Sequence, residues 1–275
     1  MNYPLYGLIN FEKQHITLFL QGKQIISFLS TLYLNYIHGY NSGYNRVEGE
    51  YNLNNHVNKP DKKYQNRAKY ITKLLPYLRK HGLQSVRMDE IAKLMEISRA
   101  TLYKYFSTKE EIIGFIVDGF IEYMNDLTFN SMDSEQSYGA RFQQMFEQSV
   151  SLIVYFSDVF IKELETSYPD CYGRFEVAVK QREDKILAFY KEGIQKGIFN
   201  DLNGKLLIMQ DEILRGMLDI KYLMLNQLTV QQILNDYYQL KKIQLFKTHK
   251  LSLVDDAAMI PRIEHLTQKI TKNLF

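Results

Sequence analysis

The sequence is poor in cysteine and has no long apolar run. Of its 275 residues only Cys171 is a cysteine, which excludes an intramolecular disulfide and a cysteine-rich zinc site and suits a reducing cytoplasm. The most apolar stretch, residues 16–37, is interrupted by polar residues at 21–24. Because a membrane helix needs about 18 or more uninterrupted apolar residues, we expect no membrane span. The same stretch lacks the basic start of a secretory signal.

The usual signatures of enzymes are also missing. The six histidines are scattered without HExxH or another metal-ligand spacing, and no glycine-rich phosphate loop occurs. The acidic pair Asp255-Asp256 falls in residues 251–275, which we expect to be a solvated C-terminal tail. We therefore expect a protein that is not an enzyme and that uses no metal and no cofactor.

Charge is unevenly distributed along the chain. Residues 61–110 hold 12 Lys and Arg against 5 Asp and Glu, a net of +7, whereas residues 111–275 hold 18 against 23, a net of −5. A basic block attached to an acidic body indicates that the block meets a polyanion and that the body does not. A solvated lysine-rich surface is the alternative, and charge alone does not decide between them.

Helical periodicity runs through the chain from residue 64 onward, and no alternating strand pattern competes with it. This predicts an all-α fold. The expected helices span residues 64–81, 88–95, 99–106, 109–127, 137–157, 158–166, 170–196, 204–226 and 230–248. Pro76 falls inside the first of them, where we expect a kink or an early end of the helix.

A helix-turn-helix is indicated at residues 88–106, where two short helices are separated by a three-residue turn. Ser98 is placed to cap the second helix, RATLYKYF. Leu102 and Phe106 form a narrow apolar stripe on that helix and anchor it to its own domain. Its remaining Arg, Thr, Lys and Tyr side chains are then free to reach a nucleic-acid groove, which favours DNA reading over a merely solvated face.

The stretch HGLQSVRMDEIAKLMEISRATLYKYFSTKEEII, residues 81–113, resembles the DNA-binding domain of TetR/AcrR-type bacterial transcriptional regulators. The resemblance rests on Gly82, Ile91, Ala92, Ile97, Ser98, Thr101, Leu102, Tyr103, Phe106, Lys109, Glu110 and Glu111. A weaker match, GIQKGIFND at residues 193–201, is similar to the turn that precedes the last two helices in this family. The resemblance implies an N-terminal three-helix DNA-binding domain followed by a helical ligand-binding and dimerisation domain.

The expected domains follow from this alignment. Residues 61–124 form the DNA-binding domain, residues 125–250 the effector-binding and dimerisation domain, and residues 251–275 the tail. Residues 1–60 are an N-terminal extension that we expect to be a dispensable arm or an artefact of start-site choice. The chain departs from the family at Pro76 and at Glu96, where the family usually has Gly in the turn. If Glu96 takes a positive φ, the strain is on the order of 1 kcal/mol.

Each residue of the basic helix is given an expected role. The resemblance implies that Tyr103 and Lys109 donate to phosphates, and chemistry supports this, since a phenol and an ammonium are suitable donors. Arg99 and Lys104 can donate to guanine edges in the major groove, with a surface charge as the alternative for Arg99. The other expected DNA-binding residues are Arg87 as a phosphate partner, Ser98, Ala100 and Thr101 near the bases, and Tyr105 in either role.

The acidic body contains two helices that we expect to pair two subunits. Residues 204–226 are apolar on more than one face, and residues 230–248 are amphipathic, a combination typical of a shared four-helix interface. Leu214, Leu218, Ile233 and Tyr237 are the interface residues that we expect. The alternative is that both helices complete a monomeric core.

In the resembled family the same domain encloses a small-molecule pocket. The candidate effector-binding residues are Met145, Phe146, Phe156, Phe160, Tyr168, Cys171, Phe175, Phe189 and Met217, although apolar aromatics at helical spacing more often belong to a core. The resemblance thus implies a homodimeric repressor that binds a near-palindromic double-stranded DNA operator and is released by a small-molecule effector. The alternative is a protein-interaction adaptor whose helix-turn-helix no longer reads DNA.

Overall fold

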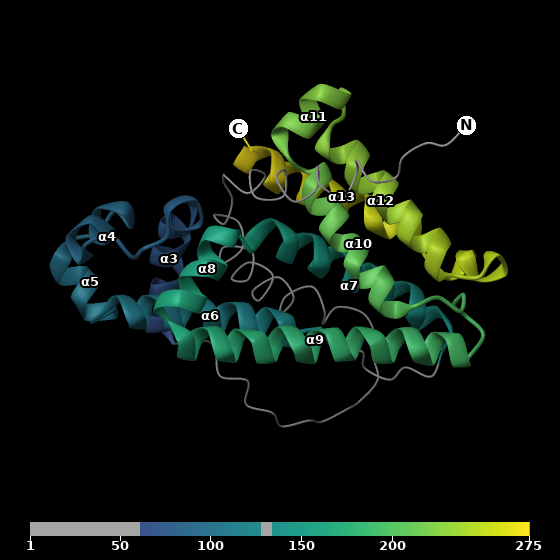
Figure 1. Ribbon diagram of the computed structural model, residues 1–275, viewed down its shortest axis with the longest axis horizontal. Coiled ribbons are helices and arrows are strands. Elements are labelled where there is room, and N and C mark those ends of the chain that lie inside the picture. Colours follow the sequence, from purple (N-terminus) through teal and green to yellow (C-terminus); the bar gives the residue numbers. More distant parts are fainter. Residues whose placement is uncertain (1–60, 128–133, 275) are drawn as a thin grey trace, which may run out of the picture.

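The computed structural model describes residues 61–127 and 134–274, and those residues are mostly helical (Figure 1). The elements are α3 (Lys62–His81), α4 (Met88–Leu94), α5 (Arg99–Tyr105), α6 (Lys109–Asn125), α7 (Gln136–Tyr155), α8 (Asp158–Ser167), α9 (Pro169–Gln195), α10 (Gly204–Met217), α11 (Ile220–Asn226), α12 (Val230–Leu245), the 3-10 helix η1 (Thr248–Leu253) and α13 (Asp256–Leu274). Between the described residues the one strand-like contact is an isolated bridge from Phe199 to Phe246. The predicted all-α class is confirmed. The expected N-terminal extension lies outside the described residues.

The first domain is built around α3. Ile71, Leu74, Leu75 and Leu78 are fully buried on one face of this helix and pack in a cluster with Leu102 and other core residues. The helix continues past Pro76 to His81, so the early end that we considered does not occur. Burial of leucines on both sides of the proline offsets the hydrogen bond that the proline removes, because tertiary packing supplies most helical stability in proteins.

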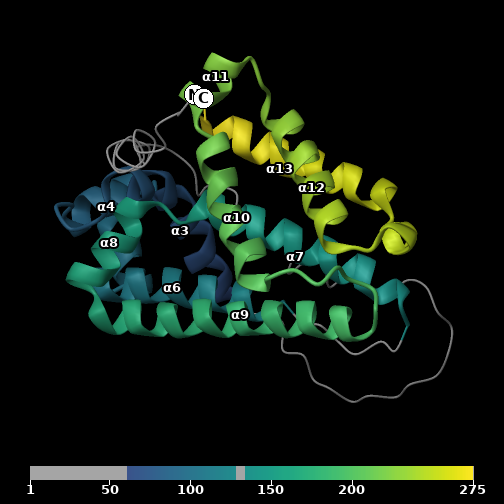
Figure 2. The ribbon, with the colours of Figure 1, turned by 45° about the vertical axis from the view of Figure 1, so that its right-hand side comes forward.

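The second domain is arranged along α9, a helix of 27 residues that runs along one edge of the molecule in both views (Figures 1 and 2). Helices α7, α10, α12 and α13 pack above it around a second apolar cluster. The first cluster also extends into α8 and α9, through Phe160, Leu164 and Phe175. The two domains therefore share packed side chains rather than a flexible joint.

One expected helix, residues 204–226, is in fact two. Helix α10 ends at Met217 and α11 begins at Ile220. The carboxylate of Asp219 accepts a hydrogen bond from the N–H of Tyr222 at 3.1 Å and caps α11. An aspartate in this position stabilises a new helix start, and the apolar periodicity that runs across the break hid that signal.

The prediction of a solvated C-terminal tail is also wrong, because residues 256–274 form a packed helix. Met259, Ile263, Leu266 and Ile270 of α13 are buried in the second cluster. The expected tail looked solvated because its polar residues are numerous, but its apolar residues recur at helical spacing and cover α7 and α12.

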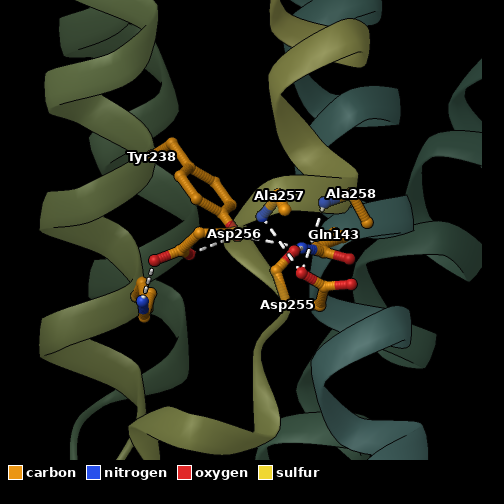
Figure 3. Close-up of polar contacts among 7 residues, drawn as sticks. Gln143, Tyr238, Asp255, Asp256, Ala257 and Ala258 are labelled. Carbon is orange, nitrogen blue, oxygen red and sulfur yellow. Dashed lines mark hydrogen bonds and ion pairs between the residues drawn. The ribbon is translucent and has the colours of Figure 1, made fainter.

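Polar contacts hold the start of α13 in place, as Figure 3 shows. The amide of Gln143 in α7 donates to the carbonyl of Asp255 at 2.6 Å and to the hydroxyl of Tyr238 at 3.0 Å. The carboxylate of Asp256 lies 2.6 Å from the ammonium of Lys242 and accepts from Tyr238. Nearby, a Cβ on Gly139 would lie 2.0 Å from the carbonyl oxygen of Leu253, so η1 can approach α7 only over a glycine. The acidic pair therefore anchors the start of α13, although Asp255 is exposed and Asp256 is only partly buried.

Candidate DNA interface

The turn between α4 and α5 contains a residue in the left-handed region. Glu96 has a φ of 57°, so the positive φ considered for this position is present. Its side chain forms an ion pair with Lys73 of α3. The N–H of Ile97 donates to the carbonyl of Ala92 at 2.9 Å and closes the turn. These contacts fix the direction in which α5 leaves α4.

Helix α5 buries one narrow stripe and exposes the rest. Ser98 accepts a hydrogen bond from the N–H of Thr101 at 3.0 Å, and the two hydroxyls lie 2.8 Å apart. Leu102 is the one residue of α5 that is buried, and the following Phe106 is buried as well. The side chains left exposed are those of Arg99, Ala100, Tyr103 and Lys104, with 47% of Tyr103 accessible. The helix lies at one end of the molecule (Figure 1). The arrangement presents cations and a phenol outward from a fixed backbone.

Arg87 is a further exposed cation of the helix-turn-helix. It is the N-cap residue of α4 and is exposed. Its backbone N–H donates to the carboxylate of Glu90 at 2.8 Å, so the position of the residue is set by the backbone while the guanidinium stays in solvent.

Tyr105 points into the protein rather than toward a groove. Its hydroxyl accepts a hydrogen bond from the side-chain amide of Asn66 at 2.9 Å, and its ring meets that of Tyr70 edge to face at 5.2 Å between centroids. Of the two roles considered for it, neither phosphate nor base contact fits this orientation. Tyr105 instead packs α5 against α3.

Lys109 is engaged in the structure. Its ammonium donates to the carbonyls of Leu83 and Gln84, at 3.0 and 3.1 Å, in the loop that follows α3. The residue therefore holds this loop against the start of α6, and its expected phosphate contact stays a prediction.

Arg67 and Glu111 hold α5 and α6 in place; Glu111 was named above only for the resemblance, and Arg67 was not predicted. The guanidinium of Arg67 lies 2.6 Å from the carboxylate of Glu111 and 4.5 Å from the ring centroid of Phe106. The other oxygen of Glu111 accepts from the N–H of Ser107 at 2.7 Å. The Thr-x-x-Glu spacing of residues 108–111 is a capping-box signature that could have revealed Glu111. No local signal indicates Arg67.

The predicted effector residues do not gather in one place. Phe156, Phe160, Tyr168, Cys171 and Phe175 belong to or pack against the first cluster, which also contains the buried residues of α3, α4 and α5. Met145, Phe146, Phe189 and Met217 belong to or pack against the second. Met145, Phe146, Phe160, Phe175 and Phe189 are buried in these clusters, and the other four are partly buried against them. Contact between any of these residues and an effector stays a prediction.

The predicted interface residues are buried inside a single chain. Leu214, Leu218, Ile233 and Tyr237 each expose 7% or less of their surface and lie in the second cluster. They therefore cannot meet a partner without unfolding their own domain, and their assignment to an interface is wrong. Helices α10, α11 and α12 expose other apolar side chains, namely Leu206, Met209, Ile213, Met224, Leu225, Leu240 and Ile243.

Two features of the described residues bear on other functions. Within residues 61–127 and 134–274, no group of three or more His, Cys, Asp or Glu side chains is arranged to hold a metal ion. None of the helices there is long and apolar enough to cross a membrane.

Comparison with known proteins agrees with this arrangement. Residues 77–114, which contain α4, the turn and α5, match the family model of bacterial regulatory proteins of the tetR family. No curated protein sequence matches the chain.

Several solved structures are similar in fold. One, described as superantigen pfit, has a TM-score of 0.51 at 13% identity, covering 79% of this chain and 100% of that one. The ketosteroid transcriptional regulator KstR2 of Mycobacterium tuberculosis has a TM-score of 0.48 at 19% identity over 74% of this chain and 100% of its own. A regulator from Saccharomonospora viridis in complex with choline has a TM-score of 0.48 at 15% identity, over 66% and 98%.

Proposed function

The helix-turn-helix of this chain is that of the tetR family of bacterial regulatory proteins, and on that premise we propose that the protein is a homodimeric transcriptional repressor. In this proposal it binds a near-palindromic operator and is released by a small-molecule effector. The observation that carries it is the exposure of Arg99, Tyr103 and Lys104 on a helix anchored by Leu102. The proposal assigns no catalysis to the chain and implies a cytoplasmic protein, since bacterial DNA lies there.

The exposed face of α5 suits the major groove. A helix fits this groove, where Arg and Lys can donate to guanine edges. Tyr103 at the side of the helix and Arg87 at the start of α4 are placed to donate to phosphates on either side. Two subunits related by a two-fold axis would put two copies of α5 into successive major grooves about 34–36 Å apart.

We propose that the dimer forms through exposed apolar residues of α10 and α12. Leu206, Met209 and Ile213 are spaced by three and four residues and form one stripe on α10, and Leu240 and Ile243 are exposed on α12, which packs beside it. Exposed apolar patches of this kind mark protein interfaces. A charged Ile213→Glu variant is expected to remain folded and to sediment as a monomer. The matched control is Lys180→Glu, an exposed charge reversal on α9, which is expected to remain dimeric.

A mobility-shift assay with the DNA upstream of the protein's own gene tests the main proposal. Wild-type protein is expected to shift this DNA in the presence of excess unrelated DNA. The double variant Arg99→Ala, Lys104→Ala is expected to lose the preference, whereas Lys180→Glu keeps it. A protein that folds normally but shifts no DNA would be the adaptor, and the proposal would then be rejected.

A further inference from the structure

A group of charged and hydroxyl side chains lies inside the second domain, where α7, α9, α10 and α12 meet. We name it the Asp211 cluster, and it consists of Gln148, Ser149, Arg182, Tyr190, Asp211, Tyr237 and Lys241. Its surroundings are apolar: Leu207 and Leu214 of α10 are buried, and the ring of Phe146 lies 6.0 Å from that of Tyr237. Its charged members were not predicted from the sequence.

Arg182 is bonded only to neutral groups. Its Nε donates to the side-chain oxygen of Gln148 at 2.6 Å and its Nη2 donates to the hydroxyl of Ser149 at 2.7 Å. In the part of the chain that the structure describes, no carboxylate lies within ion-pair distance of this guanidinium. Burial lowers the pKa of Arg182, and the more distant charge of Asp211 acts in the opposite direction.

Asp211 is already shared between two other groups. Its carboxylate lies 2.9 Å from the ammonium of Lys241 and accepts from the hydroxyl of Tyr237 at 2.6 Å. Lys241 also donates to the backbone carbonyl of Leu207, and burial lowers the pKa of this lysine as well. The cluster thus contains two cations and one carboxylate, so one positive charge has no counter-charge.

Arg182 is partly exposed, so solvent and a solute can reach its guanidinium, whereas its partners Gln148 and Ser149 are buried. A cation beside buried groups that has no counter-charge is costly in proportion to the water that it loses. Guanidinium groups bind carboxylates through paired hydrogen bonds, and Arg182 has donors beyond the two that Gln148 and Ser149 occupy. Tyr190 lies near both Arg182 and Asp211, Tyr237 is bonded to Asp211, and Phe146 packs against Tyr237, so the cluster has an aromatic side. The charge and its lining therefore suit an anion with an apolar body.

We propose that the Asp211 cluster binds the anionic head group of the effector, a carboxylate attached to an apolar body, with Arg182 and Lys241 as its cations. This inference rests on the proposed function for its regulatory meaning. A route to the DNA-binding domain is present, because Gln148, the partner of Arg182, also donates to the carbonyl of Tyr123 in α6 at 2.6 Å. A carboxylate that draws Arg182 away from Gln148 alters the support of α6, the helix that follows α5.

Titration of the full chain with benzoate, hexanoate and octanoate tests the site, with the neutral amide of each acid as its matched partner. Calorimetry is expected to show saturable binding of at least one carboxylate, with at least tenfold weaker binding of its amide. The variant Arg182→Gln is expected to weaken carboxylate binding at least tenfold, and the exposed control Lys180→Gln, on the same helix, to leave it unchanged. Equal binding of acid and amide, unchanged affinity in Arg182→Gln, or binding of no carboxylate in the series would overturn the inference.

Thermal unfolding without ligand separates a binding role from a structural one. If the charge of Arg182 serves a ligand, Arg182→Gln is expected to melt at or above the wild-type temperature, because the uncompensated charge is gone. A clearly lower melting temperature would show that Arg182 serves the fold and would count against the site. The DNA-shift assay is run in parallel. A chain that binds its operator but none of the carboxylates overturns this inference alone, whereas loss of specific DNA binding overturns the proposed function.

Discussion

Glu163 and Leu83 are 80 residues apart in the sequence, and in the fold the two carboxylate oxygens of Glu163 lie 2.7 and 3.0 Å from the backbone N–H of Leu83. Leu83 follows the end of α3 in the DNA-binding domain, and Glu163 is buried on α8. Lys109 holds the same loop from its carbonyl side. A side chain of the second domain thus caps a loop of the first, and any shift of α8 acts on the base of the DNA-binding domain.

The protonation of Glu163 gives the first prediction. Burial raises the pKa of Glu163, with the N–H of Leu83 and the charge of Lys109 acting in the opposite direction. A carboxyl group whose pKa is raised on folding destabilises the fold when it ionises, so stability is greater below its folded pKa and falls as pH rises through it. In Glu163→Gln, which keeps an acceptor for Leu83, this decrease is expected to be absent. Urea unfolding from pH 4.5 upward measures the free energy of unfolding of both proteins. The same dependence on pH in wild type and in Glu163→Gln would contradict the prediction.

A second prediction separates two tyrosines that are two positions apart. Tyr105→Phe removes the acceptor of the Asn66 amide and is expected to lower the free energy of unfolding by about 0.5–1.5 kcal/mol while leaving DNA affinity unchanged. Tyr103→Phe, at an exposed position, is expected to weaken DNA binding while leaving the free energy of unfolding unchanged. Denaturant titration and DNA-shift assays on both variants compare them. The interpretation fails if Tyr105→Phe weakens DNA binding at unchanged stability.

A third prediction distinguishes base contacts from phosphate contacts. Arg99→Ala or Lys104→Ala is expected to relax the preference at one or two base pairs, at a cost of about 1–3 kcal/mol on the correct operator. Arg87→Ala is expected to weaken binding to all sequences alike and to reduce the salt slope by about 1. Affinities are measured at several salt concentrations on the operator and on point-substituted operators. A uniform loss in all three variants would show that these roles are wrongly assigned.

A fourth prediction concerns the attachment of α13. Gln143→Leu fills a similar volume but leaves the carbonyl of Asp255 without its donor, so the free energy of unfolding is expected to fall by about 1–3 kcal/mol. Ile260→Ala on the exposed face of α13 is the control, and its effect is expected to stay within about 0.5 kcal/mol. Denaturation in urea measures both. Equal losses in the two variants would mean that the polar contacts do not hold the helix.

The two helices of the helix-turn-helix could be predicted well because their signals are local. The cap at Ser98 and the stripe of Leu102 and Phe106 placed α5 to within one residue. The same reasoning missed the orientation of Tyr105, although a residue three positions after Leu102 lies on the same side of a helix.

The rest of the molecule depends on contacts between distant segments, which periodicity does not specify. Ile213 and Leu214 are neighbours and both apolar, yet the first is 61% exposed and the second is fully buried. Only the packing of α10 against its neighbours decides which of them faces the core. Arg182, Asp211 and Lys241 come from three different helices and are far apart in the sequence. No local pattern therefore indicates that their charges meet.

The attachment of α13 to α7 also determines the order in which the chain acquires its structure during synthesis. Gln143 and Asp255 are 112 residues apart, and at roughly 5–20 residues per second the ribosome needs about 6–22 s to make the segment between them. The contacts among α3, α4 and α5 join residues that are close together in the sequence. They can form before the later segment has been synthesised. In the nascent chain the DNA-reading part is therefore complete while α7 still lacks the helix that covers it, and this apolar surface needs protection from aggregation until α13 arrives.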